Sequence, residues 1–560
     1  MPLSGDSFVN IAFSFPFVNT FFQNFCPFLK LFFEPYILCL SPGHTTYMST
    51  IGFFHRSKRG GQSAAIPYHP EKNPRFPAKI SAAALQKIFA DCADFSLRGV
   101  WPGGQARPGV SLCWLDGLVS GQTVSAEVLR PLTDDARLGA AGSARECAEE
   151  LLHGAVWCAG ARRRTTLDAL AEDLLNGWCA VIFDALGEAV CFEAKSTNLR
   201  SVDTPTVEKS IKGGKDAFVE ALRTNTALVR RRVRDPALKL AQTCIGRKSA
   251  TAVGIFWLEG VANPETLALL RARLDAIDID GFVSAGNLEP YLVDRPNSPF
   301  PQLLHTERSD KFASELLAGR IGILVDGLPL GFLLPATLAH FMKVAEDKAQ
   351  HFLIASGLTL LRWLSTLLSL LFPAVFVAVC MYHQEMIPTK LLLSMIEAKQ
   401  QVPFSVAFEV LTMLVAFELL LEAGIRLPDP VGDTVSIIGA LIVGQSAVEA
   451  RIVSPISVIV VATAAICGFT QPSRDMGAAL RLLRVGMVFL AIVLGLFGIA
   501  IGCALLVWYL CTLESFGVPY VSPMGEGGWR EVLHAFVRPP MPSDKLRERA
   551  LRTPDKRSQK

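Results

Sequence analysis

The sequence predicts a mixed fold, in which an N-terminal soluble region of two duplicated α/β subdomains precedes an all-α transmembrane bundle. Two observations support this prediction. Long apolar stretches are concentrated in roughly the last 200 positions of the 560-residue chain, which is 51% hydrophobic with a mean hydropathy of +0.36. The first half resembles ordinary soluble domains in composition, and within it one pattern occurs twice.

The repeated pattern consists of two matches in the same order. Residues 111–118 (SLCWLDGL) and 254–261 (GIFWLEGV) share Trp-Leu-acid-Gly. Residues 171–184 (AEDLLNGWCAVIFD) and 313–326 (ASELLAGRIGILVD) share Leu-Leu-x-Gly, an apolar run and a closing Asp. The separation along the chain is nearly the same for both matches. We therefore predict that the two segments are homologous subdomains.

Each copy combines helical and strand periodicity. Residues 263–278 and 166–177 show 3.6-residue spacing of apolar side chains; the first begins with Asn263 as N-cap and the second ends in glycine. After each Leu-Leu-x-Gly helix comes an apolar run of strand length, then a turn, then a second apolar run. This order predicts a helix followed by a β-hairpin, and Asp326-Gly327 is a strong hairpin signal.

A cluster of arginines lies between the two copies. Arg230, Arg231, Arg232 and Arg234 could contact another subunit or anionic lipid head groups. The alternative is a solvated or salt-bridged helix face that ends before Pro236. At the level of sequence both interpretations stay open, and the four arginines are subunit or lipid interface candidates.

The segment 1–80 differs from the rest of the chain. Residues 1–47 are rich in Phe and interrupted by proline, without the basic segment or small-residue cleavage site of a signal peptide. They are either a stretch upstream of the true start at Met48 or a membrane-associated segment. Residues 56–80 are basic and rich in Pro, Gly and Ser, which predicts a linker. We expect residues 1–80 to be a disordered extension.

No catalytic motif is recognisable in the sequence. GGKD at 213–216 lacks the earlier glycine and the Ser/Thr of a phosphate loop, and there is no G-x-G-x-x-G, G-x-S-x-G or H-E-x-x-H. The thirteen cysteines include no C-x-x-C pair, and the nine histidines form no ligand pattern. The net charge of +3 gives no bulk attraction to nucleic acid. We therefore predict no enzyme activity, catalytic residue, cofactor, metal site or nucleic-acid partner.

Five apolar stretches are candidates for membrane helices, since a spanning helix needs about 20 residues. They lie at 364–381, 402–421, 434–450, 453–470 and 485–511. The third is short and rich in small residues, which predicts a helix that is buried in the bundle or re-entrant. Four glycines are candidates for close helix packing: Gly498 and Gly502, which form a G-x-x-x-G motif, and Gly439 and Gly444.

Basic residues predict the orientation of the bundle. Lys343, Lys348 and Arg362 precede the first stretch, and the tail at 525–560 holds nine Lys/Arg against five Asp/Glu. The positive-inside rule places both on the cytoplasmic side, so the number of crossings should be even and the stretch at 434–450 should not cross. The count is complicated by three arginines before the last stretch, Arg474, Arg481 and Arg484.

Carboxylates within the apolar stretches are the candidates for an ion pathway. On a helix, Glu418, Glu422 and Arg426 lie on one stripe, which predicts an i,i+4 pair between Glu422 and Arg426 as a structural charge pair. Glu418 then has no partner in its own helix, and Glu409 projects from the opposite face. Carboxylates that face water inside an oligomer would favour the passage of cations. The ion-pathway candidates are therefore Glu409, Glu418 and Glu422.

Several specific stretches follow one another in the second half of the soluble region and in the apolar part. They include RSVDTPTVEKSIKGGKDAFVEALRTNTALVRRRVRDPAL (200–238), SPFPQLLHTERSDK (298–311), GRIGILVDGLP (319–329), HQEMIPTKLLLS (383–394) and FELLLEAGIRLPDPVGDTVSIIGALIVGQSAVEA (417–450). With these stretches, residues 195–523, more than half of the chain, closely resemble the A subunits of bacterial spore nutrient germinant receptors, the GerA family. The region at 81–195 resembles the first subdomain of the family more loosely, and Ala217 stands where the family usually has glycine.

The resemblance implies a function and partners. Members of the family lie in the inner membrane of the spore, with a large cytoplasmic N-terminal region and a C-terminal membrane bundle. They work with a transporter-like B subunit and a lipoprotein C subunit, and they are thought to form a pentameric, nutrient-gated channel for monovalent cations. The resemblance thus implies an A subunit that triggers spore germination, with membrane lipids as further partners.

Two alternatives stay open. The chain could be a non-conducting scaffold that relays a signal to its partners, or the related homologue encoded with the dipicolinate-channel genes. Neither the nutrient nor the gate can be deduced from these residues. The domain boundaries that we predict are 1–80 for the extension, 81–195 for the first subdomain, 196–247 for a helical connector, 248–345 for the second subdomain, 346–523 for the membrane bundle and 524–560 for a basic cytoplasmic tail.

Overall fold

The structure is a computed structural model, and every description below concerns the residues that it describes. These all belong to the compact unit Pro70–Lys560. They are residues 75–559 with the exception of 106–108, 197–204, 206–207, 209–211, 283, 285–287, 427–443 and 525–528, and without the side chains of residues 425 and 426. The predictions for residues 1–47, the partner role of Arg426 and the packing role of Gly439 lie outside them.

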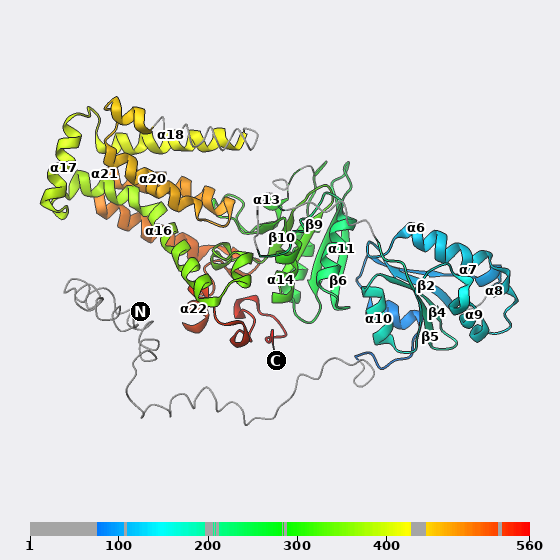
Figure 1. The fold of residues 1–560 in the computed structure, drawn as a ribbon. Helices are drawn as coiled ribbons and strands as arrows, with labels where there is room; N and C mark the ends of the chain where they lie inside the picture. Colours follow the sequence, from blue (N-terminus) through cyan, green and yellow to red (C-terminus); the bar gives the residue numbers. More distant parts are fainter. Residues whose placement is uncertain are drawn as a thin grey trace, which may run out of the picture. The chain divides into compact units, whose positions relative to one another are not determined.

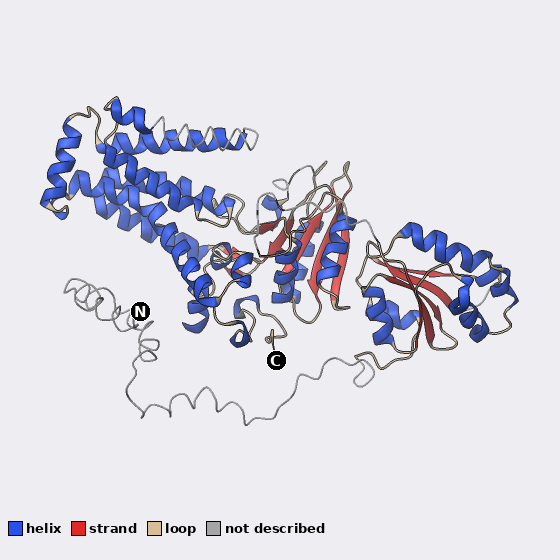
Figure 2. Cartoon of the chain, in the orientation of Figure 1, coloured by secondary structure: helices blue, strands red, loops and turns tan. Residues whose placement is uncertain are grey.

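Two antiparallel five-stranded sheets lie in the N-terminal region (Figures 1 and 2). The first, in the order β1-β2-β4-β5-β3, joins Phe95–Gly99, Val110–Leu115, Trp178–Phe183, Glu188–Glu193 and Ala161–Arg164. The second, in the order β6-β7-β9-β10-β8, joins Leu238–Ile245, Thr251–Leu258, Ile321–Val325, Gly331–Leu334 and Leu304–Thr306. Counted along each copy, the two strand orders are the same, so the predicted duplication is confirmed.

Helices cover both faces of the first sheet. Successive side chains of a strand point to opposite faces. In β4, Cys179, Val181 and Phe183 therefore enter one apolar cluster, while Ala180 and Ile182 enter another. The second cluster is closed by α5 (Ala82–Ile88) and α10 (Leu167–Leu175). The first is closed by a series of short helical segments: α6 (Gly121–Thr123), η3 (Val124–Leu129), α7 (Arg130–Asp134), α8 (Ala136–Ala140), α9 (Ala144–Glu150) and η4 (Leu151–Ala155).

The second sheet is covered partly by chain that returns from the bundle. On one face, Phe256 and Leu333 pack with α11 (Leu222–Arg232), α14 (Ser309–Ala318) and residues that follow much later, among them Leu480 and Tyr520. On the other face, the strands pack against α12 (Pro264–Asp275) and α13 (Glu289–Leu292). The second copy therefore does not close its own core.

Local sequence signals set the ends of several elements. Asn263 caps α12, and its side chain accepts a hydrogen bond from Glu265 N, as predicted. Gly177 follows the C-cap of α10 with φ of +82°, a conformation that glycine adopts without strain. The two predicted hairpins are β4–β5 and β9–β10, and Gly327 in the second turn has φ of +84°.

Helices form the C-terminal half. They are α16 (Phe352–Tyr382), α17 (Thr389–Gln400), α18 (Val406–Arg426), α20 (Pro455–Phe469) and α21 (Arg474–Thr512), and α15 (Leu338–Phe341) precedes them. Among the described residues, α16 and α21 are long and apolar enough to cross a membrane, and α20 is a shorter apolar helix. Of the stretch predicted at 434–450, only residues 444–450 are described.

The stretch predicted as one span at 485–511 is not a single straight helix. Gly495 has φ of +61° and ψ of −142°, which no helix contains. A Cβ at Gly502 would lie 2.6 Å from Sδ of Met487, although an unbroken helix would place residues fifteen apart about 22 Å from each other. The chain therefore reverses at Gly495, and α21 consists of two antiparallel arms, 474–494 and 496–512.

The predicted basic tail is folded against the second copy. After β11 (Glu514–Ser515) and β12 (Val518–Pro519) come α22 (Trp529–Phe536), η8 (Met541–Ser543) and η9 (Arg549–Leu551). Leu551 and Thr553 are buried, and Oε2 of Glu548 accepts a hydrogen bond of 2.8 Å from Arg320. Ion pairs within the chain thus hold part of the tail in place.

Candidate functional site: charged groups in the helical bundle

Glu409 is fully buried at the start of α18. One oxygen of its carboxylate accepts a hydrogen bond from Nζ of Lys399, in the last turn of α17. The other accepts hydrogen bonds of 2.9 Å from the backbone N–H of Ser454 and from the Ser457 hydroxyl, at the N-terminus of α20. A helix N-terminus favours a negative charge. Glu409 therefore joins α17, α18 and α20 in this structure.

Glu418 finds its partner on another helix. Its carboxylate accepts a hydrogen bond of 3.0 Å from Nε of Arg481 in the first arm of α21, and 54% of its side chain is exposed. The sequence required a partner on a neighbouring helix or water, and the structure supplies the partner. The arginine itself was missed as a site residue; its signal was a charged side chain inside a long apolar stretch.

One turn of α21 further on, Arg484 is buried. Its guanidinium donates a hydrogen bond of 2.6 Å to Oγ of Ser369 in α16, and its Nε has no hydrogen-bond partner among the described residues. Next to it, the amide of Gln471 donates to the hydroxyl of Thr366. Polar contacts thus join α16 to α21 and to the turn that follows α20.

The predicted pair between Glu422 and Arg426 concerns a side chain outside the described ones. Glu422 itself lies on α18, one turn after Glu418, and has partners in the structure. Its position as an ion-pathway candidate remains a prediction.

The packing glycines act within one hairpin. A Cβ at Gly498 would collide with the carbonyl oxygen of Leu490, and the one at Gly502 would meet Met487, so both glycines allow the two arms of α21 to approach closely. At Gly444 a Cβ would make only an ordinary contact, 3.8 Å from Val458. Close approach is therefore required at Gly498 and Gly502.

The four arginines of the cluster between the copies form hydrogen bonds or ion pairs with other residues of the chain. Arg230 is fully buried and forms two hydrogen bonds, of 2.7 and 2.8 Å, to the carboxylate of Asp94 in the first copy. It is therefore an interior residue and is unsuited to a lipid or subunit interface. Arg232 pairs with Asp216. Arg231 donates a hydrogen bond to Ser196 O, and Arg234 donates one to the side chain of Asn176.

An ion pair that the sequence did not indicate connects the second sheet to the bundle. Nδ1 of His305, in β8, lies 3.1 Å from a carboxylate oxygen of Asp475, in the first turn of α21. Burial alone would lower the pKa of His305, but the hydrogen bond to Asp475 and the charge of Glu289 outweigh it and raise that pKa above its usual value. The contact is thus strongest when the imidazole is protonated.

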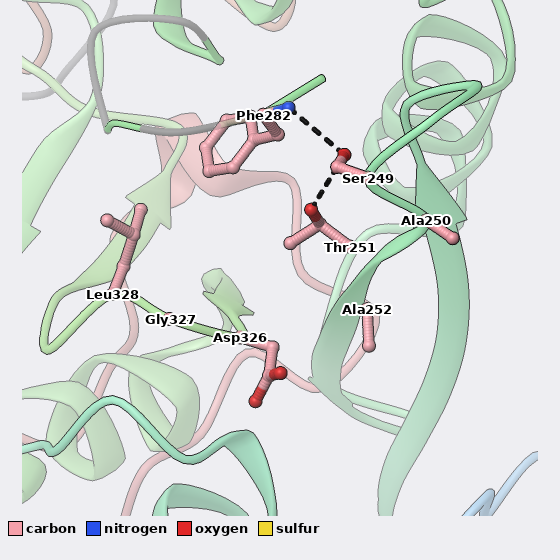
Figure 3. Close-up of a pocket in the computed structure, with 8 residues that line it drawn as sticks. All are labelled: Ser249, Ala250, Thr251, Ala252, Phe282, Asp326, Gly327 and Leu328. Atoms are coloured by element: carbon pink, nitrogen blue, oxygen red, sulfur yellow. Dashed lines mark hydrogen bonds between the residues drawn. The ribbon is translucent and has the colours of Figure 1, made fainter. Parts of the chain in front are cut away.

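A cavity of about 260 Å³ lies at the tips of two hairpins of the second copy (Figure 3). Oγ of Ser249 accepts a hydrogen bond from Phe282 N and lies 3.0 Å from the hydroxyl of Thr251, and Asp326 contributes the one carboxylate of the lining. The lining contains no pair of groups for acid–base catalysis. Among the described residues, no three His, Cys, Asp or Glu side chains are placed to hold a metal ion.

Comparisons with known proteins identify the family. The model of the Bacillus/Clostridium GerA spore germination protein matches residues 83–550. Spore germination protein KA of Bacillus subtilis is 35% identical, over 85% of this chain and 86% of that protein. Spore germination protein A1 of the same organism is 37% identical, over 68% and 79%, respectively.

A solved structure also matches, the N-terminal domain of the A subunit of the Bacillus megaterium spore germinant receptor GerK3. It is 26% identical and covers 47% of this chain and 98% of that domain, at a TM-score of 0.36. The family match spans most of the chain, and the structure adds long apolar helices to it. The chain therefore belongs to the GerA family of spore germination proteins.

Proposed function

We propose that this chain is the A subunit of a spore germinant receptor and assembles into an oligomer, of pentameric form by resemblance to its family, that passes monovalent cations when the receptor binds its nutrient. The B and C subunits are its partners in the inner membrane of the spore, and the two α/β copies lie on the cytoplasmic side. Basic residues near the first turns of α16 support this orientation: Arg538 contacts Ser356, and Arg362, ten residues after the start of the helix, pairs with Asp347.

The observation that carries the proposal is the position of Glu418. The side chain lies in the middle of α18 and is half exposed, beside the exposed apolar side chains Val415 and Leu419. A carboxylate at bilayer depth is costly against lipid and normally faces water or another protein. Its Arg481 partner is also partly exposed. An aqueous path between subunits would hydrate this ion pair and give the carboxylate a role in attracting cations.

Flux measurements on the receptor in liposomes test the proposal. We expect liposomes that contain the wild-type oligomer, with B and C subunits and nutrient, to release K⁺, and Glu418→Gln to lower that flux roughly two- to tenfold because one attractive charge is removed. Glu418→Asp should restore it. Glu449→Gln is the matched control, because Glu449 is bonded to Gln445 at the end of the bundle. Equal flux in Glu418→Gln and wild type would remove Glu418 from the pathway.

Glu409→Gln separates conduction from packing. Because Glu409 is enclosed by Lys399, Ser454 and Ser457, we expect this variant to lower the thermal stability of the oligomer and to leave the selectivity of any remaining flux unchanged. A change in cation selectivity at unchanged stability would place Glu409 in the pathway instead.

A non-conducting relay is the second candidate. The observation that favours it is the direct connection between the second copy and α21, through the pair of His305 with Asp475 and the shared apolar cluster. A monomeric chain without flux in liposomes, together with normal germination of spores, would support the relay over the channel. The homologue encoded with the dipicolinate-channel genes is a further alternative. Germination of a deletion strain in single nutrients distinguishes the two, because loss of the response to one nutrient supports a germinant receptor.

A further inference from the structure

The short helix α22 lies against the first turns of α16. Phe536 packs on Trp363 with ring centroids 5.0 Å apart, and Nε1 of Trp363 donates a hydrogen bond of 3.2 Å to Ala535 O. Shortly after the helix, Arg538 N donates to Oγ of Ser356. Because Ser356 and Trp363 are seven residues apart, α22 follows a single face of α16.

The start of α22 is not covered by the described chain. Trp529, at the start of the helix, is 72% exposed, and the guanidinium of Arg530 lies 5.6 Å from its ring. Trp363 lies at the beginning of the apolar part of α16. Beside the face that contacts α22, the exposed side chains of α16 are leucines, including Leu360 and Leu364. An exposed tryptophan is thus carried by a helix that packs on the first turns of a candidate membrane span.

The charges around this surface favour an anionic partner. Glu531, the acidic residue of α22, is paired with Arg549 at 2.9 Å, so its charge is compensated. The guanidinium of Arg538 is held on the carbonyl oxygens of Lys348 and Gln350. Within the described part of the chain, no carboxylate pairs with Arg530, which adds its charge beside Trp529. Tryptophan together with arginine at the end of a span is typical of the membrane–water interface.

We propose that α22 lies in the membrane–water interface, with the Trp529 indole at the level of the upper acyl chains and Arg530 on the phosphate of an anionic lipid, and that it anchors the start of α16 to the cytoplasmic leaflet. The proposal does not depend on conduction. It requires only that α16 spans the membrane. It assigns the lipid contact to one segment, α22, and to one kind of head group, an anionic phosphate.

Quenching by brominated lipids tests the position of Trp529. The full chain is reconstituted in vesicles whose acyl chains carry bromine near the head group, which quenches tryptophan fluorescence at short range. Three variants are compared: Trp529→Phe; Trp508→Phe, a positive control inside α21; and Trp157→Phe, a negative control in the first copy. The three tryptophans are 72%, 66% and 71% exposed, so their exposure is matched.

We expect Trp529→Phe and Trp508→Phe to remove comparable parts, within about twofold, of the quenched fluorescence of the eight-tryptophan chain, and Trp157→Phe to remove none. If Trp529→Phe also removes none, α22 is not in the interface, and its exposed start serves a protein partner or faces water. Since Trp529 is exposed, the substitution should leave the fold intact, which size exclusion of the same samples verifies.

The charge of the lipid tests the second part. In vesicles of phosphatidylglycerol the quenching that depends on Trp529 should be at least about twofold stronger than in phosphatidylcholine, and Arg530→Gln should abolish the difference. Arg474→Gln, at the start of α21, is a control arginine outside α22. Equal quenching in both lipids, or no effect of Arg530→Gln, would overturn the assignment of an anionic head group.

Discussion

The two α/β copies share one strand order but differ in what completes their cores. In the first copy, helices between residues 82 and 175 cover both faces of the sheet, and α11 adds Ala227 to one of the two clusters. In the second, Leu480 from the first arm of α21 and Leu513 and Tyr520 after the second arm are part of the cluster on one face. The clusters of the first copy thus contain no described residue of the bundle, whereas the second copy is completed by the bundle.

Charged side chains at equivalent positions of the two copies show the same difference: their contacts are local in the first copy and distant in the second. The Leu-Leu-x-Gly motifs align Asp173 with Glu315 and Trp178 with Arg320. Asp173 forms an ion pair of 2.7 Å with Arg164 in the same copy. Glu315 is bonded to Arg320 and to His340, and Arg320 in turn binds Glu548 of the tail. The same site on the fold therefore makes a local contact in one copy and joins distant segments in the other.

This difference indicates which copy can pass a conformational change directly to the helical bundle. In the described part of the chain, the first copy contacts α11 and the second copy, for example through the buried pair of Arg230 with Asp94. A shift in the second copy acts directly on α21 and on the tail. The predictions that follow test this asymmetry, from the largest expected effect to the smallest.

The largest effect is expected for Arg320→Met. The substitution leaves Glu315 buried without its arginine and removes the link to Glu548, at a cost of about 3–5 kcal/mol in unfolding free energy. We expect the full chain in detergent to unfold at lower temperature and its tail after residue 540 to become sensitive to protease.

Trp178→Met at the equivalent position of the first copy is the matched control. It opens a cavity in an apolar cluster and lowers the stability of that copy by about 2–4 kcal/mol. The tail should stay protected, since no contact of Trp178 reaches it in the described structure. Release of the tail by both variants, or by neither, would contradict the asymmetry.

The second prediction concerns pH. The pKa of His305 is raised, so its contribution to stability is complete below the usual histidine pKa and is lost as pH rises through the folded value. Burial and the charge of Arg320 lower the pKa of His340, so its neutral form is stabilising and that contribution is lost as pH falls through the folded value.

Hydrogen exchange between about pH 6 and pH 8 measures both groups. After correction for the intrinsic exchange rate, protection of β8 should fall as pH rises, while protection of α15 should not. His305→Gln should make the protection of β8 independent of pH. An unchanged pH profile in that variant would assign the response to another group.

The third prediction is an equal effect in both copies. Ser143 caps α9 in a capping box with Glu146, and Asn263 caps α12. Both helices pack on the sheet of their own copy, so Ser143→Ala and Asn263→Ala should each cost about 1 kcal/mol. The measurement is chemical denaturation of the full chain, in which hydrogen exchange of the capped helix reports its unfolding. A cost that differs several-fold between the two would show that the bundle supports one of these helices.

The smallest effect is expected for Arg163→Ala at the edge of the first sheet. Arg163 pairs with Glu149 and Glu188 on a partly exposed surface, and such pairs contribute about 0.5 kcal/mol. The equivalent edge of the second copy, β8, carries His305 and its contact with α21. Arg163→Ala should therefore leave exchange in α21 unchanged, and any loss of protection there would show that the first copy is coupled to the bundle more directly.

Sequence patterns were sufficient where the signal was local. The repeated motifs identified the duplication, Asn263 marked the start of α12, and Asp326-Gly327 marked the second hairpin, because caps and turns depend on a few adjacent residues. The G-x-x-x-G pattern suggested close packing at Gly498 and Gly502, where a Cβ would meet Leu490 and Met487. The G-x-x-x-G pattern could not indicate that Gly495 reverses the chain, because glycine is compatible both with close packing and with a turn.

The fate of each charge was not predictable in the same way. Glu409 was proposed for an ion pathway from its position in an apolar stretch, yet Lys399 and Ser454, 10 and 45 residues away, enclose it. Arg230 belonged to a cluster suited to an interface, yet Asp94 holds it in the interior, 136 residues away in the sequence. Partners so distant leave no periodic signal near the charge that they neutralise.

The sequence by itself determined that the chain has two homologous α/β copies, an apolar helical half and the motifs of the GerA family. These depend on periodicity, turn residues and repeated motifs, which act over short stretches of chain. Only the tertiary structure decided which charges are buried, which copy is completed by α21 and where the tail binds. The physical reason is that the free energy of a charged or apolar side chain depends on what surrounds it, and here the surroundings come from segments far apart in the sequence.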